Sequence, residues 1–339
     1  MANSPIQNPK SKIQNRENWT RYTPGQAEGH YESFFQRANH PTRPLAFWLR
    51  YTLFSPQGRP DDTVGELWAI YFDGESGRHV ALQQEWPLNQ CHFARDGFAV
   101  QVGAAELSPG RLQGSLTRDE QNVTWRLTFT GDQSPLFLLP LRLYEGGFPK
   151  AKSLVGLPLA IYEGTLTANG QTIPVDGWVG SQNHNWGSRH TDRYAWGQVA
   201  GFDNAPDTFL EVATAQIRLG RFWTPPLTPL VLRHQGQEYA LNSLWQSGRN
   251  KGRFQPFEWQ FRAETATVRI EGEITAPAAA FVELRYRNPP GGLKQCLNSK
   301  IASCRLTLTH KADGRTETLI TTHRAAFEIL SDDTFQVTT

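Results

Sequence analysis

The residues best suited to chemistry lie in one stretch, residues 178–203. The stretch holds three tryptophans, two histidines, a tyrosine and several amides, where a structural strand normally carries valine, isoleucine and leucine. Aromatic walls with a few convergent polar groups are typical of small-molecule sites. We therefore interpret this stretch as the lining of a ligand pocket; the alternative is an aromatic core in which backbone groups satisfy the amides and histidines.

Side chains alternate across a strand, so an extended chain sorts the residues of this stretch onto defined faces. One face of its first half carries Trp178, Gln182, His184 and Trp186, and one face of its second half carries Tyr194, Trp196 and Gln198. We predict that substrate contacts Trp178, Gln182, Asn183, Asn185, Tyr194, Trp196 and Gln198.

Such residues suit the protonation of a carbon–carbon double bond. A carbocation is stabilised by ring faces, by about 0.5–2 kcal/mol per contact. The acid must stay protonated near neutral pH, and a carboxyl group buried among rings is shifted that way. Glu211, which shares a strand face with Phe209 and Ala213, is the candidate acid, although it could equally be a solvated or ion-paired strand residue. His184 could instead donate the proton or orient a water, because imidazole titrates near neutral pH.

Short strands must position these residues. Runs of β-branched and aromatic residues bounded by Gly, Pro, Asp or Asn predict strands at 47–54, 66–72, 97–102, 112–116, 123–129, 160–166, 209–217, 230–233, 239–244, 257–261, 267–274, 281–286, 303–309 and 316–323. Asn169 and Gly170 predict a two-residue hairpin turn. Residues 32–38 predict one or two helical turns, and residues 135–158 a connection. The pattern is typical of an all-β protein with antiparallel barrels or sandwiches.

The chain of 339 residues is long enough for two such domains. We expect a disordered tail at 1–18, an N-terminal β domain at 19–177 and a C-terminal β domain at 178–339, with the ligand site near their junction. The tail lacks the apolar core of a signal peptide, and no apolar run is long enough to span a bilayer. We therefore expect a cytoplasmic protein, with peripheral membrane contact possible for access to substrate.

Composition excludes several other classes of function. The net charge of +2 gives no reason to expect nucleic-acid binding. The three cysteines cannot all pair and are not spaced as metal ligands, so a reducing compartment is the simpler expectation. We expect neither metal nor organic cofactor. One alternative is an iron site with His190, Asp192 and either His234 or His310. Another is a basic loop formed by Arg249, Lys251 and Arg253, which could bind a diphosphate or a lipid headgroup but is otherwise a solvated turn.

The same stretch resembles a family signature. Gly180–Gly187 with Tyr194–Gln198 is similar to the signature of the lipocalin-like family that includes carotenoid 1,2-hydratase (hydroxyneurosporene synthase) and the AttH-type proteins. The residues at 31–35, 46–53 and 293–306 reinforce the match, and a more distant similarity to tocopherol cyclase is visible in the same places. The resemblance implies two lipocalin-like antiparallel β-barrel domains in tandem. It also implies cofactor-free hydration, cyclisation or isomerisation of an isoprenoid or polyene substrate.

In the hydratase branch, the resemblance implies that His184 and Trp186 take part in acid–base catalysis together with an acidic residue on the following strand, for which Glu211 is the nearest candidate. We therefore predict an enzyme, a hydratase-type lyase or an isomerase or cyclase, with His184, Glu211 and Trp186 as catalytic residues. The alternatives are a carrier of a lipid, pigment or polyene, and an interaction scaffold with a buried aromatic face. An acid with a raised pKa in the pocket favours the enzyme, and a pocket without titratable groups favours the carrier.

Overall fold

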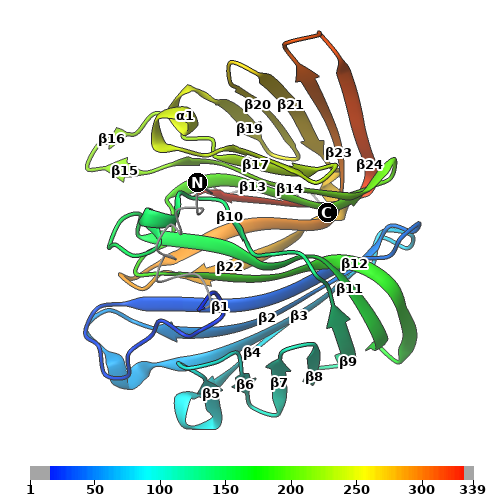
Figure 1. The fold of residues 1–339 in the computed structure, drawn as a ribbon. Coiled ribbons are helices and arrows are strands. Elements are labelled where there is room, and N and C mark those ends of the chain that lie inside the picture. Colours follow the sequence, from blue (N-terminus) through cyan, green and yellow to red (C-terminus); the bar gives the residue numbers. More distant parts are fainter. Residues whose placement is uncertain (1–15, 332–339) are drawn as a thin grey trace, which may run out of the picture.

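The computed structural model describes residues 16–331, which form two large antiparallel sheets, one above the other in Figure 1. Sheet A has 12 strands in the order β4-β3-β2-β1-β12-β11-β9-β8-β7-β6-β5, with β10 paired to β11. Its strands are β1 (His30–Asn39), β2 (Leu45–Ser55), β3 (Val64–Asp73), β4 (Val80–Pro87), β5 (Cys91–Phe93), β6 (Val100–Val102), β7 (Ala105–Ser108), β8 (Arg111–Arg118), β9 (Gln121–Thr130), β10 (Leu136–Phe137), β11 (Ala151–Ala168) and β12 (Gln171–Gly187).

Sheet B has 10 strands in the order β18-β17-β14-β13-β24-β23-β21-β20-β19, with β22 paired to β23. Its strands are β13 (Arg193–Phe202), β14 (Ala205–Gln216), β17 (Leu230–His234), β18 (Gln237–Leu241), β19 (Lys251–Gln255), β20 (Glu258–Glu264), β21 (Val268–Thr275), β22 (Val282–Arg287), β23 (Leu293–His310) and β24 (Thr316–Ser331). A small ribbon of β15 (Arg218–Leu219) and β16 (Phe222–Trp223) projects from it. The helical segments are α1 (Leu244–Arg249) and the 3₁₀ turns η1 (Pro60–Asp62), η2 (Leu88–Gln90), η3 (Leu141–Leu143) and η4 (Ala278–Ala280).

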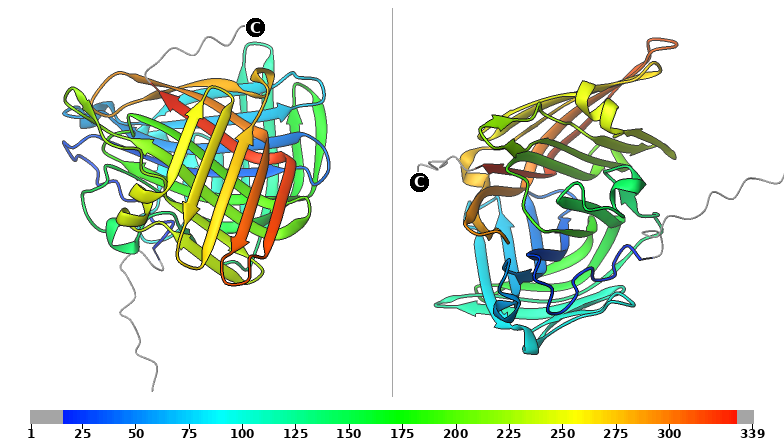
Figure 2. Two further views of the ribbon diagram at one scale, coloured as in Figure 1. Left: turned by 90° about the horizontal axis from the view of Figure 1, so that it is seen from above. Right: turned by 90° about the vertical axis from the view of Figure 1, so that its left-hand side faces the viewer.

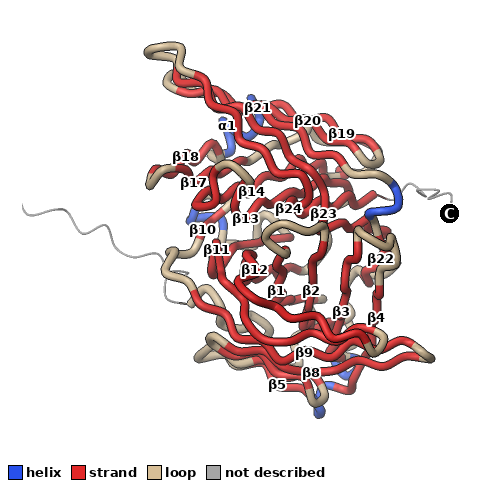
Figure 3. Tube along the Cα trace, turned by 90° about the vertical axis from the view of Figure 1, so that its right-hand side faces the viewer, coloured by secondary structure: helices blue, strands red, loops and turns tan. Residues whose placement is uncertain are grey.

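The two sheets are the two tandem lipocalin-like β domains predicted from the sequence. Sheet A curls into a nearly closed barrel, whose lower side is formed by β5–β9, while sheet B forms a half-barrel (Figure 3). From above, β20, β21 and β23 pass across the strands of sheet A (Figure 2). Apolar residues fill the interior of sheet A, and a second cluster extends from the interface between the sheets into sheet B.

Several predicted local features are confirmed. The strand at 47–54 lies within β2, and the strand at 209–217 largely coincides with β14. Asn169 and Gly170 connect β11 to β12 with φ angles of 48° and 79°, both positive. This is the geometry that a two-residue turn requires, because its backbone then follows the twist of the strands.

Two local expectations are wrong. The helical turns expected at 32–38 are instead part of β1, a strand that is buried along its whole length between β2 and β12. Ladder bonds on both edges and packing on both faces outweigh the weak local preference of this sequence. The connection expected at 135–158 is only partly irregular, because β11 already begins at Ala151.

The chain passes from sheet A to sheet B at residues 188–192, since β12 remains in sheet A as far as Gly187. The predicted division between 177 and 178 falls inside β12. Most of the predicted tail lies outside the described residues, but Asn18 accepts a hydrogen bond from Gln182 of β12 at 2.9 Å. None of the helices within residues 16–331 is long and apolar enough to cross a membrane.

Candidate active site between the two sheets

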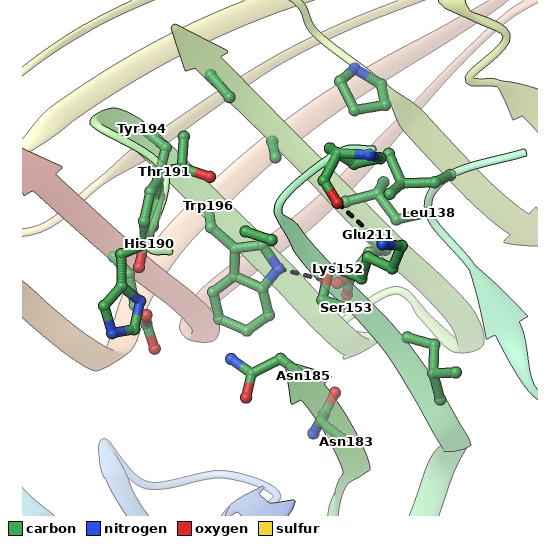
Figure 4. Close-up of a pocket in the computed structure, with 18 of the residues that line it drawn as sticks. Leu138, Lys152, Ser153, Asn183, Asn185, His190, Thr191, Tyr194, Trp196 and Glu211 are labelled. Atoms are coloured by element: carbon green, nitrogen blue, oxygen red, sulfur yellow. Dashed lines mark hydrogen bonds between the residues drawn. The ribbon is translucent and has the colours of Figure 1, made fainter. Parts of the chain in front are cut away.

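A cavity of about 210 Å³ lies where sheet A faces sheet B. Sheet A contributes Tyr31, Phe35, Trp48, Arg50, Ser153, Asn183 and Asn185, and sheet B contributes Tyr194, Trp196, Glu211, Tyr286 and Glu328. Other residues that line it are Leu138, Leu139, Leu143, Phe148, Pro149 and Leu244. In Figure 4, Trp196 stands between Glu211 and Ser153 on one side and His190 and Tyr194 on the other. The lining combines aromatic and aliphatic side chains with several polar or charged groups, among them Lys152.

Glu211 is held in a fixed orientation at one end of this cavity. It lies on β14 directly opposite Gln198 of β13, whose Nε2 donates to Glu211 Oε2 at 2.7 Å. Trp196 Nε1 donates to Glu211 Oε1 at 2.8 Å. The Gln198 amide is itself fixed, because its Oε1 accepts from Arg37 Nε at 2.7 Å and from Ser181 Oγ at 2.6 Å. Each carboxyl oxygen therefore accepts one bond from a donor that cannot turn away.

The carboxyl group of Glu211 is only 2% exposed. Burial raises its pKa to about 7, although the hydrogen bonds from Gln198 and Trp196 and the charge of Arg37 act in the opposite direction. A carboxyl group with a pKa in this range exchanges its proton near neutral pH. Glu211 can therefore give a proton to a ligand in the cavity or take one from it.

The two faces of β12 look into different parts of the molecule. Asn183 and Asn185 line the cavity, whereas Trp178, Gln182, His184 and Trp186 alternate onto the opposite face, toward the interior of sheet A. The cavity therefore receives only the two asparagines among the predicted residues of this strand. From β13 it receives Tyr194 and Trp196, while Gln198 supports Glu211 from behind.

His184 belongs to a second polar cluster that contains Glu32 of β1. His184 Nε2 contacts Glu32 Oε1 at 2.8 Å, and His30 Nε2 contacts Glu32 Oε2 at 3.0 Å. The backbone N–H groups of Arg21 and Tyr22 also donate to this carboxylate. Although burial alone raises the pKa of Glu32, the hydrogen bonds and charges of the two histidines outweigh it and hold the pKa at about 2. Glu32 is thus ionised at neutral pH.

Both ring nitrogens of His184 have partners. Its Nδ1 lies 2.5 Å from the carbonyl oxygen of Glu17, and its Nε2 faces Glu32, so both positions adjoin acceptors. The ring stacks on Phe34 at 4.2 Å between centroids and is completely buried. This arrangement leaves neither nitrogen free to exchange a proton with a ligand in the cavity.

The predicted residues that share this face with His184 are also packed. Trp186 contacts Tyr144 and Leu154 in a small apolar cluster, and Trp178 stacks on Phe47 at 5.9 Å between centroids. Gln182 is 1% exposed. On this face the aromatic residues fill the core, as the alternative interpretation of the stretch expected.

A stack of rings closes the end of the cavity away from Glu211. The centroids of Tyr31 and His190 are 4.0 Å apart, and those of His190 and Tyr286 are 5.8 Å apart. The guanidinium of Arg50 lies 4.6 Å from the centroid of Tyr286. Burial and the charge of Arg50 lower the pKa of His190 to about 3, so its ring is neutral and Nε2 donates to the carbonyl of Arg287 at 3.1 Å.

Sequence reasoning missed the residues that β1, β2 and β22 bring to the site. The signal for Arg50, and for Glu32 in the separate cluster inside sheet A, was a charged residue inside an otherwise apolar or aromatic run. Such residues are rarely buried without a partner, so each marked a special environment. Tyr31, Trp48 and Tyr286 carried no comparable signal, because aromatic residues at alternate positions are ordinary in strands.

The iron site considered as an alternative is not assembled. Asp192 is ion-paired with Arg189, as expected for a structural residue, and His234 contacts Thr208 and Glu317. Within residues 16–331, no group of three or more His, Cys, Asp or Glu side chains lies close enough to hold a metal ion.

A family model described as tocopherol cyclase-like matches residues 149–329, just over half of the chain. The chain belongs to the tocopherol cyclase-like family. The matched range includes Glu211, Trp196 and both asparagines of the cavity. Two uncharacterized proteins from two strains of Mycobacterium tuberculosis are 24% identical over 208 residues, 61% of this chain and 61% of theirs. The chain therefore spans about three-fifths of the length of these relatives.

Three solved structures share the fold across both sheets. Kievitone hydratase from Nectria haematococca has a TM-score of 0.57 and 11% identity, covering 92% of this chain and 94% of its own. An AttH-type protein from Nitrosomonas europaea has a TM-score of 0.54 and 13% identity, covering 89% and 92%. CghA has a TM-score of 0.54 and 11% identity, covering 91% and 90%. The predicted resemblance to tocopherol cyclase and AttH-type proteins is thereby confirmed; at these identities, the structures establish a common fold.

Proposed function

We propose that this protein is a cofactor-independent enzyme of the lyase or cyclase type that protonates a double bond of a hydrophobic, isoprenoid-type substrate. The observation that carries the proposal is Glu211, a buried carboxyl group with a pKa of about 7 that faces a cavity lined by aromatic and aliphatic side chains. Membership of the tocopherol cyclase-like family supports the reaction class. An acid with a raised pKa in the cavity favours an enzyme over a carrier.

In the proposed first step, the carboxyl proton of Glu211 moves to one carbon of the double bond and leaves a carbocation at the other. The resulting carboxylate is stabilised by the N–H groups of Trp196 and Gln198 and by the charge of Arg37. These donors are in place before the reaction, so little reorganisation is needed as charge develops. The ring of Trp196, which lines the cavity beside Glu211, stabilises the cation.

The second step decides the product. Attack by water gives hydration, and attack by an internal nucleophile gives cyclisation; in both cases the excess proton returns to the Glu211 carboxylate. Loss of a proton from a carbon next to the cation to that carboxylate gives isomerisation. Asn185 bears on the choice, because its Oδ1 is buried and has no hydrogen-bond partner among the described residues. An unpaired acceptor in the cavity wall can hold a water or a substrate hydroxyl. We therefore place hydration first and cyclisation second.

The size of the cavity limits the substrate. Sites for drug-sized ligands usually enclose roughly 300–1,000 Å³, and this cavity encloses about 210 Å³. We propose a compact isoprenoid, or a longer chain of which only one end enters. A polyene, one of the substrates expected from the sequence, therefore fits only as a long chain with one end in the cavity.

We further propose that substrate enters from a lipid surface. Nine large apolar residues are exposed within residues 16–331. Two of them, Phe148 and Leu244, line the cavity, and four more follow the lining residues Ile217 and Leu244 closely in the sequence: Leu219, Phe222, Trp223 and Trp245. Arg221 and Arg249 accompany Phe222 and Trp245, at 5.0 and 5.9 Å from the ring centroids. Aromatic and basic residues together are typical of interfacial anchors.

Flotation with vesicles of phosphatidylcholine and phosphatidylserine tests this contact. Binding should fall when Phe222 and Trp223 are replaced by Ser, but not when the remote exposed residue Ile320 is replaced by Ser. Equal binding by both variants would contradict a lipid contact at these residues.

Turnover in D₂O tests the proposed reaction. The protein is incubated with short isoprenoid alcohols and acids, and the products are analysed by mass spectrometry. Protonation at carbon should place one deuterium on carbon in a hydrated, cyclised or isomerised product, and hydration should also add the elements of water. Tight binding of a probe that is recovered unchanged and without deuterium would favour the carrier instead.

A further inference from the structure

Arg50 of β2 lines the cavity and has no counter-ion. Its side chain is 5% exposed, and no carboxylate of residues 16–331 lies within ion-pair distance of the guanidinium. Its one hydrogen bond runs from Nη2 to Ser33 Oγ at 2.7 Å, and the buried Nε has no partner. A buried charge without a partner is costly, and natural proteins seldom keep one.

Ring stacking accounts for only part of this environment. The guanidinium lies 4.6 Å from the centroid of Tyr286 and 5.7 Å from that of Trp48. Ring faces attract the charge, but they do not supply the in-plane acceptors that the guanidinium N–H groups require. Stacking therefore stabilises the position of Arg50 and leaves its donors available.

Arg37 provides a comparison on the neighbouring strand. It is also completely buried between the sheets, yet its nitrogens donate to Gln198, Asn39 and the carbonyl of Arg324. The structure thus satisfies one buried arginine with protein acceptors and leaves another facing the cavity. Arg50 is the unsatisfied arginine, and a second unpaired donor lies near it. Trp48 lines the same cavity, and its Nε1 is buried without a partner.

We propose that Arg50 and Trp48 form a binding subsite for an anionic oxygen group of the substrate. The subsite offers a positive charge and N–H donors, and a carboxylate or phosphate oxygen supplies the missing acceptors. It lies beside Tyr286, which stacks with His190 at the end of the cavity away from Glu211. This inference rests on the proposed function and gives the substrate one orientation in the cavity. The anionic group binds at Arg50, and the reacting double bond lies near Glu211.

Three probes with the same ten-carbon isoprenoid chain test the subsite by calorimetric titration at pH 8: geranic acid, geranyl phosphate and geraniol. Wild-type protein should bind at least one of the two anions about 10- to 150-fold more tightly than the neutral alcohol, as expected for charge-assisted hydrogen bonds. The stronger anion distinguishes a carboxylate subsite from a phosphate subsite. Equal affinity for all three, or binding of none, overturns the proposal.

Arg50→Met and Arg37→Met separate binding from folding. Arg50→Met should bring the affinity for the anion down to that for geraniol, leave geraniol binding unchanged, and cause little or no loss of thermal stability. Arg37→Met should lower the melting temperature clearly, because it leaves several buried acceptors unpaired. If Arg50→Met weakens all three probes equally, or destabilises the fold as Arg37→Met does, Arg50 is structural and the proposal fails.

This outcome is independent of catalysis. Glu211→Gln should retain the preference for the anion, because Glu211 lies at the other end of the cavity. If the protein prefers the anion but incorporates no deuterium, the subsite is supported and the proposed enzymatic function is contradicted. If the protein incorporates deuterium but does not prefer an anion, the enzymatic function is supported and the subsite is contradicted.

Discussion

Glu32 and Glu211 are both glutamates on central strands, and both are almost completely buried, at 0% and 2% exposure. Their chemistry is nevertheless opposite, since the pKa of Glu32 lies at about 2 and that of Glu211 at about 7. Glu32 faces the interior of sheet A, where His184 and His30 contact it, whereas Glu211 faces the cavity between the sheets.

The difference shows that partners, rather than burial alone, decide the state of a buried acid. Glu32 receives two imidazoles and two backbone N–H groups, which favour the charged form. Glu211 receives one indole and one amide N–H, both uncharged, and these do not offset its desolvation. In the proposed function, Glu32 and His184 therefore stabilise the fold and Glu211 transfers the proton.

The largest expected effect separates the two acids by activity. Glu211→Gln should lower turnover by about 100- to 10,000-fold, the usual contribution of a general acid. Glu32→Gln should leave turnover per folded molecule within a few-fold of wild type. Turnover is measured on an identified substrate. The melting temperature is measured as well, because Glu211→Gln places an amide nitrogen opposite an N–H donor, which is an unfavourable contact. Comparable losses of turnover in both folded variants would remove the distinction.

Stability should show the reverse order. Glu32→Gln should reduce the free energy of unfolding by about 3–5 kcal/mol at pH 7, because two buried histidines lose their carboxylate. Glu211→Gln should cost about 1–3 kcal/mol, since one hydrogen bond becomes unfavourable. Urea unfolding monitored by tryptophan fluorescence measures both. A cost for Glu32→Gln below that for Glu211→Gln would be inconsistent with the assignment.

Trp186 and Trp196 extend the comparison to the two faces. Trp186→Ala should cost about 3–5 kcal/mol, as for a packed aromatic residue, and should not alter ligand affinity in the molecules that remain folded. Trp196→Ala should weaken binding of a hydrophobic ligand, because Trp196 lines the cavity. Chemical unfolding and ligand titration of both variants check this, and loss of affinity in Trp186→Ala alone would reverse the two roles.

The pH dependence of stability should have two opposite limbs. Because the pKa of Glu211 rises on folding, from 4.5 to about 7, its contribution should fall by about 3 kcal/mol as pH increases across that interval. Because the pKa of Glu32 falls to about 2, its contribution is present above pH 4.5 and is lost as pH decreases toward 2. The free energy of unfolding of both Gln variants is measured from pH 3 to 8. Glu211→Gln should abolish the fall in stability with rising pH, and Glu32→Gln should abolish the loss at acid pH.

The smallest effect concerns the hydrogen bond from Trp196 to Glu211. Trp196→Phe removes a donor that lowers the pKa of Glu211, so the decline in activity above neutral pH should move upward by about one pH unit. A pH–rate profile measures the shift. A profile that moves downward, or that does not move, would mean that Glu211 is not the titrating acid.

Much of the local structure was predictable. Alternation correctly grouped Trp178, Gln182, His184 and Trp186 on one face, and Asn169 and Gly170 gave the turn that sets the register of β12 against β11. The family resemblance implied an acid on the strand after the motif, and its nearest candidate, Glu211, lines the cavity. The strand at 30–39 was missed, because its mixture of polar and aromatic residues lacks a period of two.

The sequence by itself determined which side chains share a face, because the period of a strand is a local property of the backbone. It did not determine which of the two faces of β12 meets sheet B. That choice depends on how β1, β12, β13 and β14 pack, and it places Asn183 rather than His184 beside Gln198. Tertiary structure also paired His184 with Glu32, 152 residues away, and left Arg50 without a counter-ion. Contacts between distant segments therefore decided which buried charges are paired within the fold and which face the cavity.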